Sequence, residues 1–203
     1  FYENNTFNLI QSRVSGGGYA GDGASLADEL DFTAQNLGND GKGGNAGEVV
    51  IHELVHQWWG LGNMFDPSDV DSEWSSEGLT TYTTYRIVKE FYGEELAEKN
   101  YVDRWRAEVE DYYKNFYVRH PEYLSVLPEE YQADISNSLR SVRQYSEMAL
   151  KILKTEELVG GEEAMDEILH NLFTRELDPS YPYLTYQEFL DACGLTEEEL
   201  SID

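Results

Sequence analysis

Residues 49–60 read Val-Val-Ile-His-Glu-Leu-Val-His-Gln-Trp-Trp-Gly, an apolar run without proline that contains His52, Glu53 and His56. Such a run predicts a buried helix, because apolar residues lie on nearly all of its sides. A spacing of four places His52 and His56 one turn apart on one face, where both imidazoles can reach one metal ion. Glu53 projects about 100° round the helix from His52, where it can take a proton from a metal-bound water. A zinc hydrolase needs this donor set, a third ligand and an open position for water.

A chance match on an ordinary buried helix is the alternative explanation of this pattern. Composition alone would produce His-Glu-x-x-His somewhere in the chain with a chance of roughly one per cent. Two histidines and a glutamate inside an apolar helix are also costly to bury unless something binds them. We therefore interpret His52 and His56 as metal ligands and Glu53 as the general base.

The third ligand is expected to be a carboxylate on a following helix. Ser75 or Ser76 can cap such a helix, which leaves Glu77 in its first turn. Twenty residues lie between His56 and Glu77, enough to leave one helix, cross a loop and return. Glu73 is the competing candidate, but it precedes the capping serines and is expected in the loop. The sequence therefore favours Glu77 as the third ligand.

These two motifs together resemble those of the M1 (gluzincin) aminopeptidases. That family has H-E-x-x-H-x-W-[FW]-G followed by W-x-x-E-G, which match residues 52–60 and 74–78 of this chain. The gap between the two motifs is two residues longer here, so the loop between them carries a small insertion. The resemblance implies a Zn²⁺ cofactor and a thermolysin-like zinc peptidase catalytic domain. Such a fold is mainly α (α+β), a helical lobe with a small N-terminal β element.

The glycine-rich segment near the N-terminus resembles the edge strand that lines the substrate cleft of this family. There the family has G-x-M-E-N, whose Glu grips the free α-amino group of the substrate. The matching residues, expected to bind substrate, are Gly17, Gly18, Tyr19 and Ala20. Ala20 stands where that Glu should be, which puts exopeptidase specificity in question but leaves zinc chemistry untouched. Three other acidic residues are candidates to replace it: Asp22, Asp28 and Glu29.

A tyrosine in a later helix resembles another functional residue of the family. Residues 143–150 read R-Q-Y-S-E-M-A-L and are similar to the family's Y-x-K-G-x-x-x-L, whose tyrosine donates a hydrogen bond to the oxyanion of the tetrahedral intermediate. Tyr145 matches that tyrosine, while Glu147 and Met148 replace the usual Lys-Gly. With 15 tyrosines in the chain, a packing role for Tyr145 is the alternative.

The rest of the chain predicts one compact domain that is mostly helical. We expect a strand over 7–14, a helix over 25–37, and a helix from Glu77 that stops at Gly93. Further helices are expected over 94–117, 133–154 and 162–176, and a capping box at Thr185–Glu188. A set of aromatic residues is expected to pack in the core: Tyr101, Trp105, Tyr112, Tyr113 and Phe116. Residues 1–45 would form the strand and cleft region, and 46–203 the helical lobe.

Composition restricts the classes of partner. The formal net charge is −26 and no basic patch exists to meet phosphate, which argues against nucleic-acid binding. An acidic, solvated surface is the simplest interpretation, and attraction of cationic peptide substrates is the functional one. The single cysteine, Cys193, excludes an internal disulfide and a cysteine zinc cage.

The sequence also suggests how the domain is used. The sequence shows neither a signal peptide nor an apolar run long enough to span a membrane. We therefore predict that this segment is a soluble catalytic core and is part of a larger protein. It resembles the M1-like segments fused to bacterial ABC-type membrane permeases, which implies an extracytoplasmic domain of a membrane-bound parent. The alternative to a peptidase is a peptide-binding or sensory module of such a transporter assembly. Retention of Glu53 favours the enzyme, because a binding module has no need of a general base.

Overall fold

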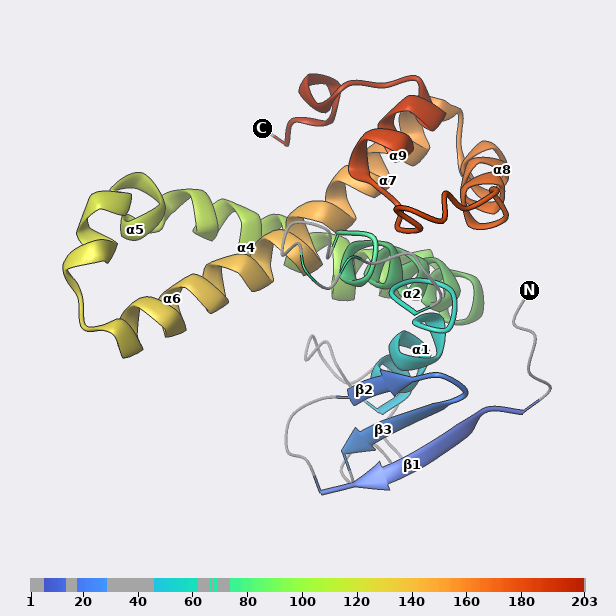
Figure 1. Cartoon of the computed structure of the whole chain (residues 1–203), viewed down its shortest axis with the longest axis horizontal. Coiled ribbons are helices and arrows are strands. Elements are labelled where there is room, and N and C mark those ends of the chain that lie inside the picture. The colour runs from blue at the N-terminus through green and yellow to red at the C-terminus, as the bar shows by residue number, and fades with distance from the viewer. Residues whose placement is uncertain are drawn as a thin grey trace.

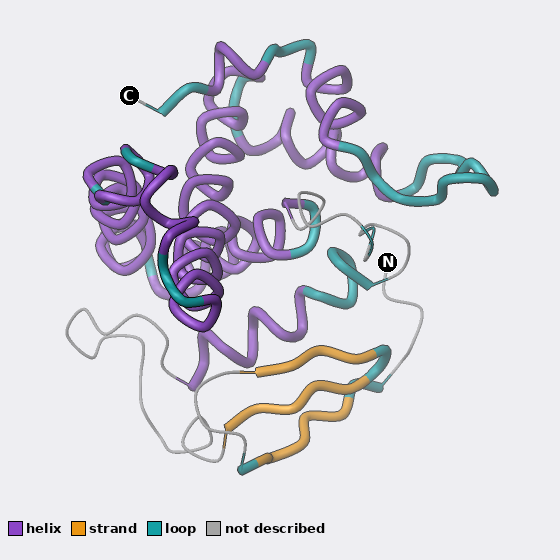
Figure 2. The backbone as a smooth tube through the Cα atoms, turned by 60° about the vertical axis from the view of Figure 1, so that its left-hand side comes forward, coloured by secondary structure: helices purple, strands orange, loops and turns teal. Residues whose placement is uncertain are grey.

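The computed structural model describes residues 6–13, 18–28, 46–61, 66, 68 and 74–202. This part of the chain is mainly helical and carries one small sheet at its N-terminal end, as Figures 1 and 2 show. The predicted fold class, a helical lobe with a small N-terminal β element, is therefore confirmed. Among the described residues, no helix has both the length and the apolar character needed to cross a membrane.

The sheet has three strands, β1 (Asn8–Ser12), β2 (Gly18–Gly21) and β3 (Ala24–Asp28). Its order is β1-β3-β2, with β3 parallel to β1 and antiparallel to β2, so β2 forms one edge. The turn between β2 and β3 uses Gly23 at a φ of +70°, a conformation that favours glycine.

The helix predicted over 25–37 is wrong for residues 25–28, which form most of β3. Ser25 and Ala27 are almost fully buried and alternate with the partly exposed Leu26, the period of a strand with one face on the core. Pairing with strands on both sides supplies the backbone hydrogen bonds that a helix would otherwise provide. Residues 29–37 lie outside the described part of the chain.

Two helices form the centre of the molecule. Helix α1 (Ala46–Val55) packs on β2 and β3 on one side and on α2 (Glu77–Tyr92) on the other (Figure 1). Helix α2 ends as predicted at Gly93, whose φ of +95° breaks the helical path. Helix α2 is therefore held between α1 and the helices that follow it in the chain.

The remaining helices follow α2 in chain order. They are α3 (Glu94–Ala97), the π-helical turn η3 (Glu98–Val102), α4 (Asp103–Lys114), α5 (Phe116–Arg119), the 3₁₀ helix η4 (Pro121–Val126), α6 (Glu129–Ser141), the π-helical turn η5 (Val142–Glu147), α7 (Met148–Val159), α8 (Glu162–Phe173), α9 (Tyr186–Cys193) and the 3₁₀ helix η6 (Glu197–Leu200). The capping box predicted at Thr185 and Glu188 is present at the start of α9.

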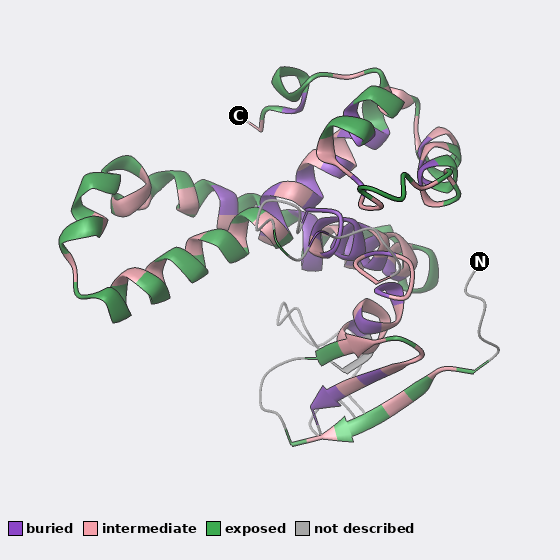
Figure 3. Ribbon diagram, viewed as in Figure 1, coloured by how far each residue is buried: buried purple, intermediate pink, exposed green. Residues whose placement is uncertain are grey.

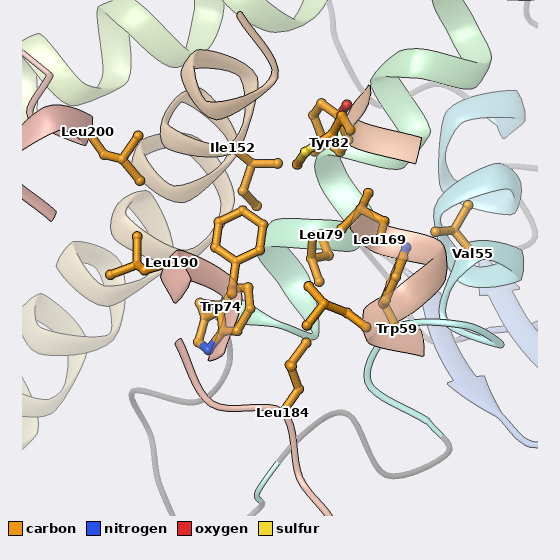
Figure 4. Close-up of a cluster of buried hydrophobic side chains, with 13 residues drawn as sticks. Val55, Trp59, Trp74, Leu79, Tyr82, Ile152, Leu169, Leu184, Leu190 and Leu200 are labelled. Carbon is orange, nitrogen blue, oxygen red and sulfur yellow. The ribbon is translucent and has the colours of Figure 1, made fainter. Parts of the chain in front are cut away.

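The core consists of two clusters that meet along α2. The first, drawn in Figure 4, packs Leu79 and Tyr82 of α2 against Ile152 of α7, Trp59 and Trp74. The second packs Tyr85 and Val88 of α2 against α3, η3, α4 and α7. Each fully buried side chain of this size contributes roughly 1.5–3 kcal/mol, so these contacts hold α2 against its neighbours.

Helices α4 to α6 form an arm that projects away from this core (Figure 1) and is mostly exposed (Figure 3). Tyr101 and Trp105 are buried where the arm leaves the core, as predicted. The expected core packing is wrong for Tyr113 and Phe116, which are 48% and 53% exposed. Tyr113 lies at the end of α4 and Phe116 at the start of α5, where the arm has left the core, and the ring of Phe116 packs on the rings of other arm residues.

Candidate metal centre

The structure brings together the three residues expected to hold a metal, His52, His56 and Glu77. Their ligand atoms all lie within 4.8 Å of one another. Among the described residues, no other group of three histidine, cysteine or acidic residues lies this close together. Glu77 Oε2 lies 3.2 Å from His52 Nε2 and 3.5 Å from His56 Nε2. Tetrahedral zinc with bonds of about 2.0–2.2 Å requires ligand atoms roughly 3.3–3.6 Å apart. The chemistry of the donor set therefore fits Zn²⁺, and the distances from Glu77 to the two histidines are close to those of a tetrahedral site.

The imidazole of His56 is oriented by contacts on its other nitrogen. His56 Nδ1 lies 3.0 Å from the carbonyl oxygen of Trp59 and 3.2 Å from Thr80 Oγ1. A carbonyl only accepts hydrogen bonds, so Nδ1 carries the proton and Nε2 is left with a lone pair. That lone pair points toward Glu77, as an imidazole ligand of a metal requires. Trp59 and Thr80 thus act as outer supports that the motif alone does not identify.

A tight turn after α1 makes this support possible. Gly60 has a φ of +88°, and a Cβ there would lie 2.2 Å from Ser76 Oγ and 3.3 Å from His56 Nδ1. Only glycine fits, because a side chain would collide with the start of α2 and with the ligand ring. Gly60 therefore allows the turn after α1 to pack closely against the start of α2, a structural role and not a catalytic one.

The charges of the three ligands are strongly coupled. Burial alone would raise the pKa of Glu77, but its hydrogen bonds to His52 and His56, and their charges, outweigh burial and hold that pKa well below its ordinary value. Burial alone would lower the pKa of His56, but Glu77 and the carbonyl of Trp59 outweigh it and raise that pKa. Glu77 is thus an ionised carboxylate throughout the neutral range, ready to bind a cation.

Glu53 lies beside the ligands and shares their pocket. Its side chain is 6% exposed, and it lines a hollow of about 260 Å³ together with all three ligands. Burial raises the pKa of the Glu53 carboxyl, and the charges of His52 and His56 oppose that shift only in part. A carboxylate with a raised pKa is a better proton acceptor near neutral pH, which is the property a general base needs.

The edge strand β2 forms the opposite wall of this pocket. Gly18, Tyr19 and Ala20 line it, as expected for the substrate-binding segment, while Gly17 lies outside the described residues. Gln57 holds β2 in place, because its Nε2 donates to the carbonyl of Gly21 at 2.9 Å and its Oε1 accepts from Gly23 N at 2.8 Å. This role of Gln57 was not predicted from the sequence, where only its position directly after His56 could have suggested it.

The strand comes unusually close to Glu53 at Gly18. A Cβ at Gly18 would lie 2.3 Å from Glu53 Oε1 and 2.4 Å from Glu53 Cγ. Gly18→Ala is therefore expected to push the carboxylate aside, at little cost to stability because the far end of a flexible side chain yields. A displacement of a catalytic group by about 1 Å can lower the rate of the catalysed reaction on the order of 100-fold. The check is kcat together with the thermal unfolding midpoint. Gly21→Ala is the control, since its added Cβ would meet no atom closer than 3.6 Å.

A fall in the midpoint that matched the fall in kcat would contradict this reading of Gly18, because the loss would then be a loss of folded protein. Equal kcat in Gly18→Ala and in the unchanged chain would contradict it as well.

Tyr145 also lies at the pocket. It is one of the lining residues, and its ring centroid lies 6.1 Å from that of His52 at an interplanar angle of 27°. The residue sits in the π-helical turn η5, and its side chain is 36% exposed. Tyr145 therefore lies on the same pocket as the three candidate ligands and β2.

None of the described candidates takes the place of the missing carboxylate. Ala20 lines the pocket, whereas Asp22 is exposed in the β2–β3 turn and Asp28 is buried at the end of β3. Neither Asp22 nor Asp28 lines the pocket. Glu29 and the competing ligand Glu73 lie outside the described residues. Among the lining residues that the structure describes, the carboxylates are Glu53 and Glu77 alone.

Comparison with known proteins bears on the family of this chain. Residues 24–197 match the model of the peptidase family M1 domain. The chain is also 30% identical over 79 residues to "Probable aminopeptidase 1" of Sulfurisphaera tokodaii, which covers 39% of this chain and 9% of that protein.

Solved structures show the same fold. An M1 zinc metallopeptidase mutant from Deinococcus radiodurans superimposes with a TM-score of 0.58 at 19% identity. The same enzyme bound to a Tyr-Ser-Ala substrate gives a TM-score of 0.55 at 20% identity. Each match covers 98% of this chain and 38% of the other. The chain therefore spans well under half the length of the proteins it resembles.

Proposed function

The chain belongs to peptidase family M1, and on that premise we propose that it is a zinc-dependent metallopeptidase that hydrolyses peptide bonds. One observation carries the proposal. Three candidate ligand atoms, all within 4.8 Å of one another, lie in one pocket with a buried carboxylate that is not among them. A structural zinc site is closed by four protein ligands, whereas a catalytic one keeps a position open. Here three ligands line an open pocket.

The residues of the pocket divide the chemistry among them. His52, His56 and Glu77 would hold the zinc, which when bound would supply a Lewis acid and lower the pKa of water to roughly 7. Glu53 accepts the proton of the attacking water and passes it to the leaving amine nitrogen. The hydroxyl of Tyr145 donates a hydrogen bond to the oxyanion that develops on the scissile carbonyl.

The edge strand offers a way to bind the peptide. Among the described strands, β2 pairs with β3 alone, so its second edge has backbone groups available to an extended peptide. The acidic chain, with a net charge of −26, would attract cationic peptides. Fusion of this domain to an ABC-type permease rests on the sequence resemblance and stays a prediction.

The second candidate function is a peptide-binding or sensory module of such a permease. The observation that favours it is Ala20, which lines the pocket where the family's amine-gripping carboxylate is expected. The same residue bears on specificity if the chain is an enzyme. Holding a charged α-ammonium in a desolvated pocket without a carboxylate partner is costly.

One library of peptides, prepared with free and with N-acetylated amino termini, tests both points. The zinc-loaded protein is expected to hydrolyse members of the library, and to lose that activity in a chelator and regain it with zinc. We expect similar kcat/KM for the two forms of one peptide, because the described pocket offers no dedicated anion to the free amine. Single-turnover rates on matched pairs are the measurement.

A strong preference for the free amine would contradict this expectation and indicate that another carboxylate holds it. Ala substitutions at Asp22, Asp28 and Glu29 would then identify that residue. Peptide binding without any zinc-dependent hydrolysis would support the binding module instead of the enzyme.

A further inference from the structure

Tyr145 lies in an unusual segment of helix. The π-helical turn η5 (Val142–Glu147) interrupts the otherwise continuous run of α6 and α7. Such a turn accommodates one extra residue, shifts the side chains after it by roughly 100° round the axis, and is concentrated at functional sites. Irregular turns persist only where surrounding contacts determine them, so the groups that hold η5 also set the direction of Tyr145.

The two residues that follow Tyr145 are both held by α4. Ser146 is 1% exposed, and its hydroxyl donates to the carboxylate of Glu108. Glu147 is 7% exposed; its Oε1 accepts a hydrogen bond from Tyr113 Oη at 2.6 Å. A buried carboxylate without partners would be costly, so Tyr113 makes the placement of Glu147 possible. Tyr145 must then project from the other side of the turn, toward α1.

A second contact fixes the far end of the turn. Met148 packs against Gly78, where an added Cβ would lie 2.5 Å from Met148 Cγ. Gly78 directly follows the ligand Glu77 on α2. The segment that carries Tyr145 is therefore fastened on one side to α4 and on the other to the helix that carries a zinc ligand.

Two features indicate that Tyr113, and not Arg143, is the main partner of Glu147. Arg143 Nε lies 3.4 Å from Glu147 Oε2, but its side chain is 60% exposed, where an ion pair contributes little. The hydrogen bond to Glu147 raises the pKa of Tyr113 to about 12, so Tyr113 keeps its proton and donates it at any working pH.

We propose that Tyr113 and Glu147 are positioning residues that aim the hydroxyl of Tyr145 at the reacting carbonyl. The proposal rests on the peptidase function proposed above. Tyr113 is exposed and lies on the arm, and Glu147 stands where the family has Lys, so the pair is a feature of this chain. Neither side chain lines the pocket, so both act through Tyr145.

Tyr113→Phe removes one hydroxyl and keeps the ring. We expect kcat to fall by about tenfold or more with KM unchanged, because the oxyanion that Tyr145 meets forms only in the transition state. In a Tyr145→Phe background the same substitution should cause no further loss. Tyr123→Phe is the matched control, since Tyr123 is a half-exposed tyrosine of the same arm whose ring packs on Phe116.

Losses that multiply in the double variant, or a rise in KM at constant kcat, would overturn the proposal, because both indicate a general structural effect. If Tyr113→Phe does not fold, the variants at Glu147 decide. Glu147→Gln keeps an oxygen that can accept from Tyr113 and should stay closer to the wild-type kcat than Glu147→Ala does. Equal kcat in those two variants would overturn the proposal.

A readout without catalysis separates this proposal from the peptidase function. The ring of Tyr145 lies beside that of His52, so its ring current shifts the NMR signals of the His52 imidazole protons. Tyr113→Phe is expected to move these signals in the zinc-loaded protein, and Tyr123→Phe is not. Unmoved signals would overturn the positioning role, whether or not the protein hydrolyses peptides.

Discussion

Glu53→Gln is expected to leave the protein folded and zinc-loaded but to reduce peptide hydrolysis by roughly 10²–10⁴-fold. The amide has nearly the shape of the carboxylate and makes similar hydrogen bonds, but it cannot accept the proton of the attacking water. Zinc binding should be unaffected, because Glu53 is not one of the three ligands. The measurements are kcat/KM on a peptide substrate and the zinc content of the purified variant.

The matched control is Glu48→Gln on the same helix. Glu48 is 8% exposed and Glu53 is 6% exposed, so both are buried acidic residues of α1. Glu48 lies 3.8 Å from Arg104 of α4, away from the pocket, and its substitution should leave kcat unchanged. A Glu53→Gln variant as active as the wild type would remove Glu53 from the mechanism.

The sequence predicted that His52, His56 and Glu77 come together, because the signal of each is local. The spacing of His52 and His56 depends only on helix geometry. Helix α2 begins at Glu77, directly after Ser76, as expected, but the Ser76 side chain makes no capping hydrogen bond. Gly93 and the capping box at Thr185 are local signals too, and the structure has both helix ends where they were expected.

The supporting roles of Gln57 and Thr80 could not be predicted in this way, because their partners are distant in the sequence. Gln57 meets the β2–β3 turn, 36 positions away at Gly21, and Thr80 meets His56 from another helix. The strand β3 was missed for the same reason. Its hydrophobic pattern over 25–28 fits a helix or a strand, and pairing with β1 and β2 decides between them.

The π-helical turns leave no trace in hydrophobic periodicity. Over 133–154 the pattern predicts one uninterrupted helix, yet η5 lies within it and carries Tyr145. The extra residue shifts the phase of the pattern by roughly 100° at one point, which the expectation of one continuous helix did not take into account. Only the contacts of Ser146 and Glu147 with α4 show that the interruption is specified by the surrounding structure.

Glu77→Gln is expected to abolish stoichiometric zinc binding. The purified wild-type protein should contain one zinc per chain. Loss of an outer-shell partner costs about 10–100-fold in metal affinity, and loss of an anionic ligand should cost more. The variant loses the charge that balances the cation, although the amide oxygen stays close to His52 and His56. Glu90→Gln, an exposed position on the same helix, is the control and should keep its zinc.

The pH dependence of zinc affinity gives an independent check on the same centre. Glu77 raises the pKa of His56, and zinc binds only the deprotonated imidazole. Below that raised pKa a proton occupies His56 and must be displaced, so the apparent affinity falls as the pH is lowered through it. The fall should be on the order of tenfold per pH unit for each displaced proton. In Glu77→Gln the pKa of His56 is no longer raised by the carboxylate, so any residual zinc affinity should begin to fall at a lower pH.

Competition with a chromogenic chelator at several pH values from 8 to 6 measures the zinc affinity of both proteins. An affinity independent of pH, or full zinc content in Glu77→Gln, would show that these three residues do not form the metal site.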